Sequence, residues 1–239
     1  MASSHPIQAA LIDLDGTLLD TVDDIAAAGN AMRAEQCRPP LSRETAAAYV
    51  GQGARSFVAR CLADSLEGSR DEALIDRWLP RFLHHYALEN GRYATLYPHV
   101  LEGLQALRAQ RLKLACVTNK PRSLTVALLE RFKLAAYFDA VVAGGDTERK
   151  KPDPQPVMLA CERLNVLPRH AAMVGDSIND AQAGRAAGCA VLLVPYGYNE
   201  GRPVEAAQAD AIVTTLARAA QWIADRNASS TIATNHHHQ

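Results

Sequence analysis

The stretch that decides the fold is residues 9–20, which read AALIDLDGTLLD. Its first four residues are all apolar, and such a run predicts a strand that is buried on both faces, as in a parallel sheet. Asp13 and Asp15 follow at once, although Asp is disfavoured in strands and costly to bury without a partner. The pair indicates either a metal-binding nucleophile beside an acid–base group or an acidic turn closed by Gly16.

Further short apolar runs, each followed by polar or turn residues, occur at 112–118, 140–143, 171–176 and 190–194. Helical patterns separate these runs. We expect one helix to start near Pro98 and another at Pro121, because proline is favoured in the first turn of a helix. Strands that alternate with helices in this way predict an α/β fold with a doubly wound parallel sheet, that is, a Rossmann-like core.

One long segment breaks the alternation, because residues 21–91 show helical patterns and no convincing strand. It opens with Thr21 and Asp24, which are spaced as in a capping box. We therefore predict a core formed by residues 1–20 and 92–226, with an all-helical domain inserted at 21–91.

The composition is that of an ordinary globular protein of 239 residues, with 48% hydrophobic and 21% charged residues. The 25 Lys and Arg residues nearly balance the 26 Asp and Glu residues, so no electrostatic footprint for nucleic acid or an anionic membrane is present. No apolar run reaches the ~18 residues of a membrane span, and no secretory signal pattern is visible. We expect a cytoplasmic protein that acts on a small molecule, without nucleic acid or membrane, as a monomer or homodimer.

Two smaller features carry little chemistry. Five cysteines lie far apart without a CxxC pair, which argues against a disulfide framework or a cysteine zinc site. The polar residues 227–239 include three consecutive histidines and are predicted to be a disordered tail.

Polar side chains end the other predicted strands as well. Each has a plain structural explanation when it is considered alone: a helix cap, a solvated basic loop, or a helix start rich in Asp. Since the carboxyl ends of parallel strands meet at one edge of a sheet, we expect a single site there. Besides Asp13 and Asp15, its members are Thr118, Lys151, Asp176 and Asp180.

Four carboxylates in one cleft would repel each other strongly without a cation. A ligand set that offers only oxygen, with no His or Cys, favours a hard metal. The sequence therefore predicts Mg²⁺ as the cofactor.

Four segments in order, DLDGTLLDT (13–21), VTNK (117–120), KKPDP (150–154) and GDSIND (175–180), resemble the motifs of the haloacid dehalogenase-like hydrolase superfamily, whose members are mostly phosphatases. The helical insertion resembles the C1 cap of that superfamily. Within the superfamily, three segments are similar to the bacterial phosphoglycolate phosphatases: YVGQGARSFVARCL in the cap, YPHVLEGLQAL at the entry to the core, and VPYGYNEGRPV near the end. Phosphatases of sugar phosphates and of N-acetylmuramic acid 6-phosphate share most of this similarity.

The resemblance implies a mechanism with an aspartyl-phosphate intermediate. Asp13 would attack phosphorus, and Asp15 would protonate the leaving alcohol and then activate water. Thr118, the amide of Asn119, and Lys151 would bind the transferring phosphoryl group.

The resemblance also implies the metal ligands, which would be Asp13, Asp176 and the backbone carbonyl of Asp15. Asp180 would orient Lys151 or metal-bound water as a neighbour of the ligands.

The segment YVGQGARS is the candidate for the loop that selects the substrate. Gly51 and Gly53 would let the backbone approach, and the Arg55 guanidinium would suit a substrate carboxylate such as that of phosphoglycolate. In the alternative interpretation the glycines only turn between helices and Arg55 is solvated.

Three other functions share parts of this pattern. A haloacid dehalogenase has no need of an acid at position 15, and a phosphomutase would return the phosphoryl group to a sugar. A phospho-accepting regulatory domain of the receiver type also uses Asp, Thr, Lys and Mg²⁺ on a parallel sheet, but it is not expected to carry a helical cap or a second Asp two residues after the nucleophile.

Overall fold

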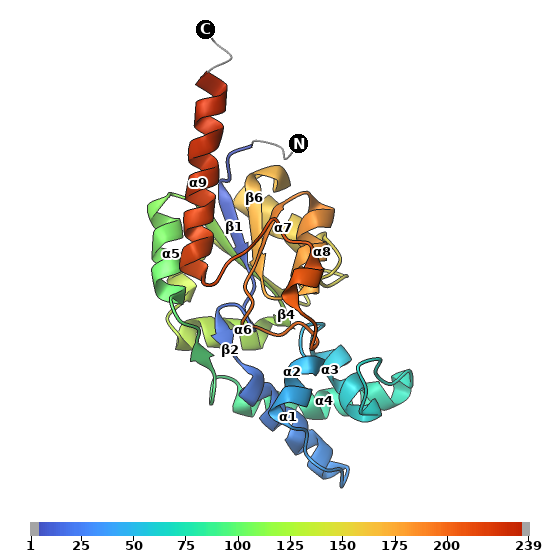
Figure 1. Cartoon of the computed structure of the whole chain (residues 1–239). Helices are drawn as coiled ribbons and strands as arrows, with labels where there is room; N and C mark the ends of the chain where they lie inside the picture. The colour runs from blue at the N-terminus through green and yellow to red at the C-terminus, as the bar shows by residue number, and fades with distance from the viewer. Residues whose placement is uncertain (1–4, 236–239) are drawn as a thin grey trace.

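The computed structural model describes residues 5–235, and its centre is a six-stranded sheet (Figure 1). All neighbouring strands pair in parallel, in the order β5-β4-β1-β6-β7-β8. The strands are β1 (Ala9–Ile12), β4 (Lys113–Pro121), β5 (Ala140–Gly144), β6 (Ala171–Gly175), β7 (Ala190–Leu193) and β8 (Ala211–Ile212). This confirms the predicted α/β class, with β8 as an additional, very short strand.

Helices cover both faces of the sheet, which explains the uninterrupted apolar runs. In β1, Ala10 and Ile12 face one hydrophobic cluster, while Ala9 and Leu11 face another. The first cluster packs against α5 (Val100–Ala109), α6 (Arg122–Arg131) and α9 (Leu216–Asn235), and the second against α7 (Gln155–Leu164) and α8 (Ile178–Ala187). The 3₁₀ helices η1 (Ala135–Tyr137), η2 (Pro168–His170) and η3 (Val204–Ala207) lie in connections.

The inserted segment forms a separate helical layer at the carboxyl edge of the sheet (Figure 1). Its helices are α1 (Val22–Glu35), α2 (Arg43–Tyr49), α3 (Ala54–Ala63) and α4 (Glu72–Glu89). Their apolar faces build a cluster of their own around Met32, Phe57 and Phe82. A short antiparallel pair, β2 (Leu19–Asp20) and β3 (Thr95–Leu96), joins the chain that enters this layer to the chain that leaves it.

The start of α1 does not form the predicted capping box. Thr21 makes no side-chain cap, and its hydroxyl instead donates to Asp15 Oδ1 at 2.7 Å. The Asp24 carboxylate accepts hydrogen bonds from the amides of Gly91 (2.6 Å) and Tyr93 (2.7 Å). Both side chains are thus recruited by residues outside their own helix.

Tyr198 fastens the same point of the chain to the core. Its hydroxyl accepts hydrogen bonds from the amides of Thr21 (2.8 Å) and Val22 (3.1 Å) and donates to Asp20 Oδ1. The hydroxyl therefore satisfies backbone donors that would otherwise be buried at the beginning of α1.

The C-terminal segment differs from the prediction of a disordered tail from residue 227. Helix α9 continues to Asn235, and the Asn227 side chain accepts from the Ile7 amide (2.7 Å) and donates to the Ile7 carbonyl (2.9 Å). This pairing anchors the helix beyond the predicted boundary. The three consecutive histidines, residues 236–238, lie outside the described residues.

None of the helices within residues 5–235 has the length and apolar character that a membrane span requires.

Candidate active site

Three neighbouring strands bring the predicted site residues to one edge of the sheet. Because β4, β1 and β6 are adjacent and parallel, their carboxyl ends lie side by side. Asp13 follows β1, Asp176 follows β6, and Thr118 lies near the end of β4. All three side chains are buried where the helical layer meets the sheet.

Asp13, Asp176 and Asp180 form an acidic cluster in which one carboxylate oxygen from each residue lies within 4.8 Å of the others. Burial raises the pKa of Asp13 to about 7, with Lys151 opposing this shift and Asp180 adding to it. Burial and the charges of Asp180 and Asp13 also raise the pKa of Asp176 well above its usual range. A cation bound here would relieve this repulsion, and an all-oxygen donor set suits a hard divalent metal.

The three carboxylates of the cluster differ in how the protein uses them. Asp180 Oδ1 accepts from the Lys151 ammonium at 2.6 Å. Its Oδ2 accepts from the Asp176 amide (3.2 Å) and from the amide and hydroxyl of Ser177 (3.2 and 2.9 Å). Both oxygens of Asp180 are therefore engaged by protein donors, which fits a residue that holds Lys151 better than a residue that binds the metal.

Asp176 is held from the other side by the loops that carry Gly16 and Tyr198. The Tyr198 amide donates to Asp176 Oδ2, and the Thr17 hydroxyl lies 3.4 Å from Asp176 Oδ1. Gly16 has a φ of +84°, and a Cβ at this position would lie 2.1 Å from Asp176 Oδ2. Only glycine satisfies both the backbone conformation and the close approach, which explains the glycine after Asp15.

Lys151 lies between two acids of the cluster. Its ammonium is 3.0 Å from Asp13 Oδ1 and 2.6 Å from Asp180 Oδ1, and it also donates to the carbonyl of Val117 at 2.7 Å. Burial lowers the pKa of Lys151, but the Asp13 and Asp180 carboxylates outweigh it and hold this pKa above its usual value. Lys151 is therefore a fixed positive charge beside Asp13. Its neighbour Lys150 is exposed.

Thr118 and Asn119 occupy the end of β4 beside the acidic cluster. The Asn119 side chain donates to the carbonyls of Gly51 and Lys151, both at 2.9 Å, and accepts from the Lys151 amide at 3.0 Å. Asn119 thus ties the Lys151 loop and the inserted layer to β4. The Thr118 hydroxyl accepts from the Lys120 amide at 3.2 Å, so its own proton remains available to a ligand in the pocket.

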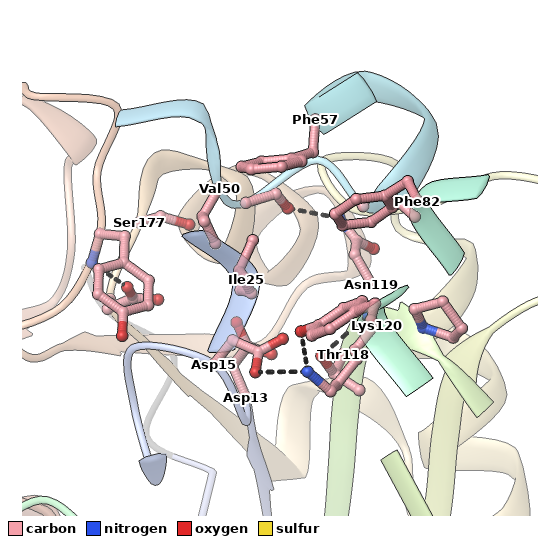
Figure 2. Close-up of a pocket in the computed structure, with 17 residues that line it drawn as sticks. Asp13, Asp15, Ile25, Val50, Phe57, Phe82, Thr118, Asn119, Lys120 and Ser177 are labelled. Carbon is pink, nitrogen blue, oxygen red and sulfur yellow. Dashed lines mark hydrogen bonds and ion pairs between the residues drawn. The ribbon is translucent and has the colours of Figure 1, made fainter. Parts of the chain in front are cut away.

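A pocket opens above these residues, between the sheet edge and the inserted helices (Figure 2). The core contributes Asp13, Asp15, Thr118, Asn119, Lys120, Pro121, Asp176, Ser177 and Tyr198. The inserted layer contributes the backbone of Gly51 and Gly53 and mostly apolar side chains: Ile25, Val50, Ala54, Phe57, Phe82 and Tyr86. The pocket therefore has a charged floor and an apolar roof.

Asp15 projects toward this pocket and not into the acidic cluster. Its Oδ1 accepts from the Thr21 hydroxyl at 2.7 Å and lies 3.3 Å from the Lys120 ammonium. The arrangement separates the two acids of the first motif: Asp13 belongs to the acidic cluster, and Asp15 faces the space above it.

The predicted selectivity loop is only partly at the pocket. Gly51 and Gly53 line it, with φ values of +124° and +83°. Arg55 does not line it, because it lies on α3 and forms ion pairs with Glu72 and with Asp76 (2.6 Å). These acids on α4 occupy the guanidinium, so the structure gives Arg55 a role within the helical layer.

Sequence reasoning missed Lys120, which lines the pocket and is only 3% exposed. It follows Thr118 by two positions in an extended segment, so the two side chains share a face. The two-residue spacing of Thr118 and Lys120 in VTNK could have indicated that Lys120 also faces the site.

Comparison with known proteins agrees with this geometry. The sequence model of the haloacid dehalogenase-like hydrolase family matches residues 10–194. A protein of Nitrosospira multiformis named phosphoglycolate phosphatase is 48% identical over 218 residues, which cover 91% of this chain and 96% of that protein. A protein of the same name from Thiobacillus denitrificans is 44% identical, with the same coverage of both chains.

A solved structure is also similar. The crystal structure of a predicted phosphoglycolate phosphatase from Haemophilus somnus superimposes with a TM-score of 0.84 at 29% identity, covering 93% of this chain and 99% of that one. The family model, the relatives and the fold agree, and the protein therefore belongs to the haloacid dehalogenase-like hydrolase family.

Proposed function

We propose that the protein is a Mg²⁺-dependent phosphatase that hydrolyses 2-phosphoglycolate to glycolate and phosphate. The observation that carries the proposal is the position of Asp13, a buried carboxylate beside the Lys151 ammonium and Asp176, at the floor of the pocket between the sheet edge and the inserted helices. Relatives that are 44–48% identical bear the name of this activity.

In the first step Asp13 attacks phosphorus. Its Oδ1 accepts from the Leu14 amide (2.7 Å) and from Lys151 (3.0 Å), which fixes the carboxylate. No donor among the described residues occupies its Oδ2, so this oxygen is available to form the bond to phosphorus while the bond to the ester oxygen breaks. Lys151, the Thr118 hydroxyl and the Asn119 amide would hold the phosphoryl oxygens.

Asp15 would act as general acid and then as general base on the leaving-group side. As the ester bond breaks, its carboxyl gives a proton to the leaving alkoxide, and it then takes a proton from the water that attacks the aspartyl-phosphate. The Thr21 hydroxyl fixes its orientation for both tasks.

The acidic cluster fits a divalent cation held by Asp13, Asp176 and the carbonyl of Asp15. Bound Mg²⁺ would supply the positive charge that lets an anionic carboxylate approach a phosphate dianion. Asp180 would keep Lys151 in place through its 2.6 Å hydrogen bond.

Residues 21–91 would act as the cap that covers the leaving group. Their apolar side chains line the pocket opposite Asp13 and would limit the access of water to it once substrate is bound. This enclosure suits an organic substrate, and a receiver domain, which is phosphorylated at an open surface, would not need it.

The direct test is a panel of phosphate esters assayed for phosphate release with and without Mg²⁺. It contains 2-phosphoglycolate, glucose 6-phosphate, N-acetylmuramic acid 6-phosphate and p-nitrophenyl phosphate. We expect kcat/KM for 2-phosphoglycolate to exceed that for glucose 6-phosphate by about 10²-fold or more, because a paired, desolvated charge contributes on this scale. Equal turnover of the sugar phosphates would reject the proposed substrate and leave only the phosphatase activity.

A second test addresses Asp15. Its replacement by Asn should lower the rate by about 10²–10⁴-fold for an alkyl phosphate, since the leaving alkoxide needs a proton. The loss should be much smaller for p-nitrophenyl phosphate, whose leaving group is stable as an anion. Equal losses for the two esters would contradict the acid–base role.

A further inference from the structure

Lys120 is a buried cation that the proposed phosphoryl chemistry does not use. It lies at the carboxyl end of β4, directly after the phosphate-binding candidates Thr118 and Asn119. Among the described residues that line the pocket, it has the one cationic side chain. A buried ammonium is costly unless it is paired, and Asp15 supplies one partner at 3.3 Å.

The contacts of the Lys120 ammonium leave room for a ligand. It lies 3.3 Å from Asp15 Oδ1, donates to the Tyr86 hydroxyl, and sits 4.2 Å from the centre of the Tyr86 ring (Figure 2). An ammonium has three N–H donors, and within residues 5–235 its oxygen acceptors are these two. The third donor is available to a group bound in the pocket.

The covalent structure of the proposed substrate puts a carboxylate beside this donor. In 2-phosphoglycolate a single methylene separates the ester oxygen from the carboxyl carbon. Asp15 has to reach the ester oxygen to protonate it, and Lys120 is in contact with Asp15. The substrate carboxylate is therefore brought close to the Lys120 ammonium, whereas a sugar phosphate presents an uncharged carbon at this place.

The surroundings of Lys120 strengthen such an ion pair. The cap lines the opposite side of the pocket with Ile25, Val50, Phe57 and Phe82. Apolar side chains lower the local dielectric constant, so charges beside them interact more strongly than in bulk water. Arg55, the cation that the sequence suggested for this role, is held by Glu72 and Asp76 outside this pocket.

We propose that Lys120 binds the carboxylate of the substrate and thereby makes the enzyme selective for short phosphorylated carboxylic acids. The inference rests on the proposed phosphatase function and assigns its selectivity to a core residue at the end of β4.

The test compares two substrates that differ only in the charged group, 2-phosphoglycolate and 2-hydroxyethyl phosphate. The ratio of their kcat/KM values is measured in the wild type and in the Lys120→Met, Lys120→Arg and Lys133→Met variants. Lys133 is an exposed lysine outside the pocket and serves as the matched control. Because both substrates are assayed in one preparation, the ratio does not depend on the fraction of folded enzyme.

We expect a wild-type ratio of about 10² or more, and a loss of about 10- to 100-fold of this ratio in Lys120→Met, as for a lost hydrogen bond between charged groups. Lys120→Arg should keep part of the preference, and Lys133→Met all of it. A wild-type enzyme without preference would reject the proposed function itself. A different outcome would contradict the role of Lys120 alone. If the wild type prefers 2-phosphoglycolate but Lys120→Met keeps the same ratio of kcat/KM values, Lys120 only positions Asp15 or stabilises the fold, and the inference is wrong.

Discussion

The hydroxyl of Tyr198 offers a sharp test of how the cap is fastened to the core. Tyr198→Phe removes one oxygen and keeps the ring that packs in the cap cluster. The Thr21 amide then loses its acceptor at 2.8 Å, and the Val22 amide keeps only a long contact of 3.4 Å to Asp20. Asp20 also loses a donor, although Arg43 still pairs with it at 2.7 Å.

The magnitude follows from these partners. A buried amide without an acceptor costs about 1–3 kcal/mol, so the Thr21 amide accounts for about 2 kcal/mol. The weaker losses at Val22 and Asp20 add about 1 kcal/mol together. We therefore expect the free energy of unfolding to fall by about 3 kcal/mol, which for a chain of this size lowers Tm by about 6–12 °C.

The assay is urea unfolding followed by circular dichroism, with the shift of the midpoint converted at constant m value. Tyr137→Phe is the matched control, because the Tyr137 hydroxyl makes only a 3.5 Å contact with Gln105, and its effect should stay below about 0.5 kcal/mol. If Tyr198→Phe is as stable as this control, the Tyr198 hydroxyl does not hold the cap to the core.

The other predictions concern the site. Asp13→Asn should abolish turnover while circular dichroism remains unchanged, because an amide is neither a nucleophile nor a good Mg²⁺ ligand; activity within tenfold of the wild type would contradict the assignment. Dialysis against EDTA should remove activity, Mg²⁺ should restore it and Ca²⁺ should not, because Ca²⁺ prefers longer bonds and more ligands; full activity in EDTA excludes the metal site. Arg55→Ala should keep the preference for 2-phosphoglycolate over 2-hydroxyethyl phosphate, since Glu72 and Asp76 hold Arg55 outside the pocket; loss of the preference would return the carboxylate site to the cap loop.

The core could be predicted because its signals are local. Runs such as AALI are apolar at every position only when helices cover both faces of the strand, and the structure shows that arrangement for β1. Asp13 and Asp176 directly follow strands that turn out to be neighbours in one parallel sheet. Strand ends and sheet topology together bring distant residues of the sequence to one place.

The parts that sequence reasoning missed depend on partners far away in the chain. Lys120 finds its place through Tyr86 of the cap, and Arg55 is turned away from the pocket by acids on α4. Thr21 has the spacing of a helix cap, yet its hydroxyl is used by Asp15. The strands β2 and β3 are two residues long, too short for any periodic pattern.

The pairing of β2 with β3 has a consequence for protein engineering. Leu19 lies opposite Leu96, and Asp20 lies opposite Thr95, in an antiparallel register. Opposite Cα atoms in such a ladder are about 5 Å apart, a gap that a two-residue hairpin turn spans. We therefore expect that residues 21–94 can be excised and replaced by Asn-Gly, or exchanged for a foreign domain, with β2 and β3 still paired. The β2–β3 pair thus makes the cap a unit that can be removed from the core. Leu124 and Tyr198 are the core residues in the apolar cluster of the cap, and removal of the cap would expose them, so both would need polar substitutes.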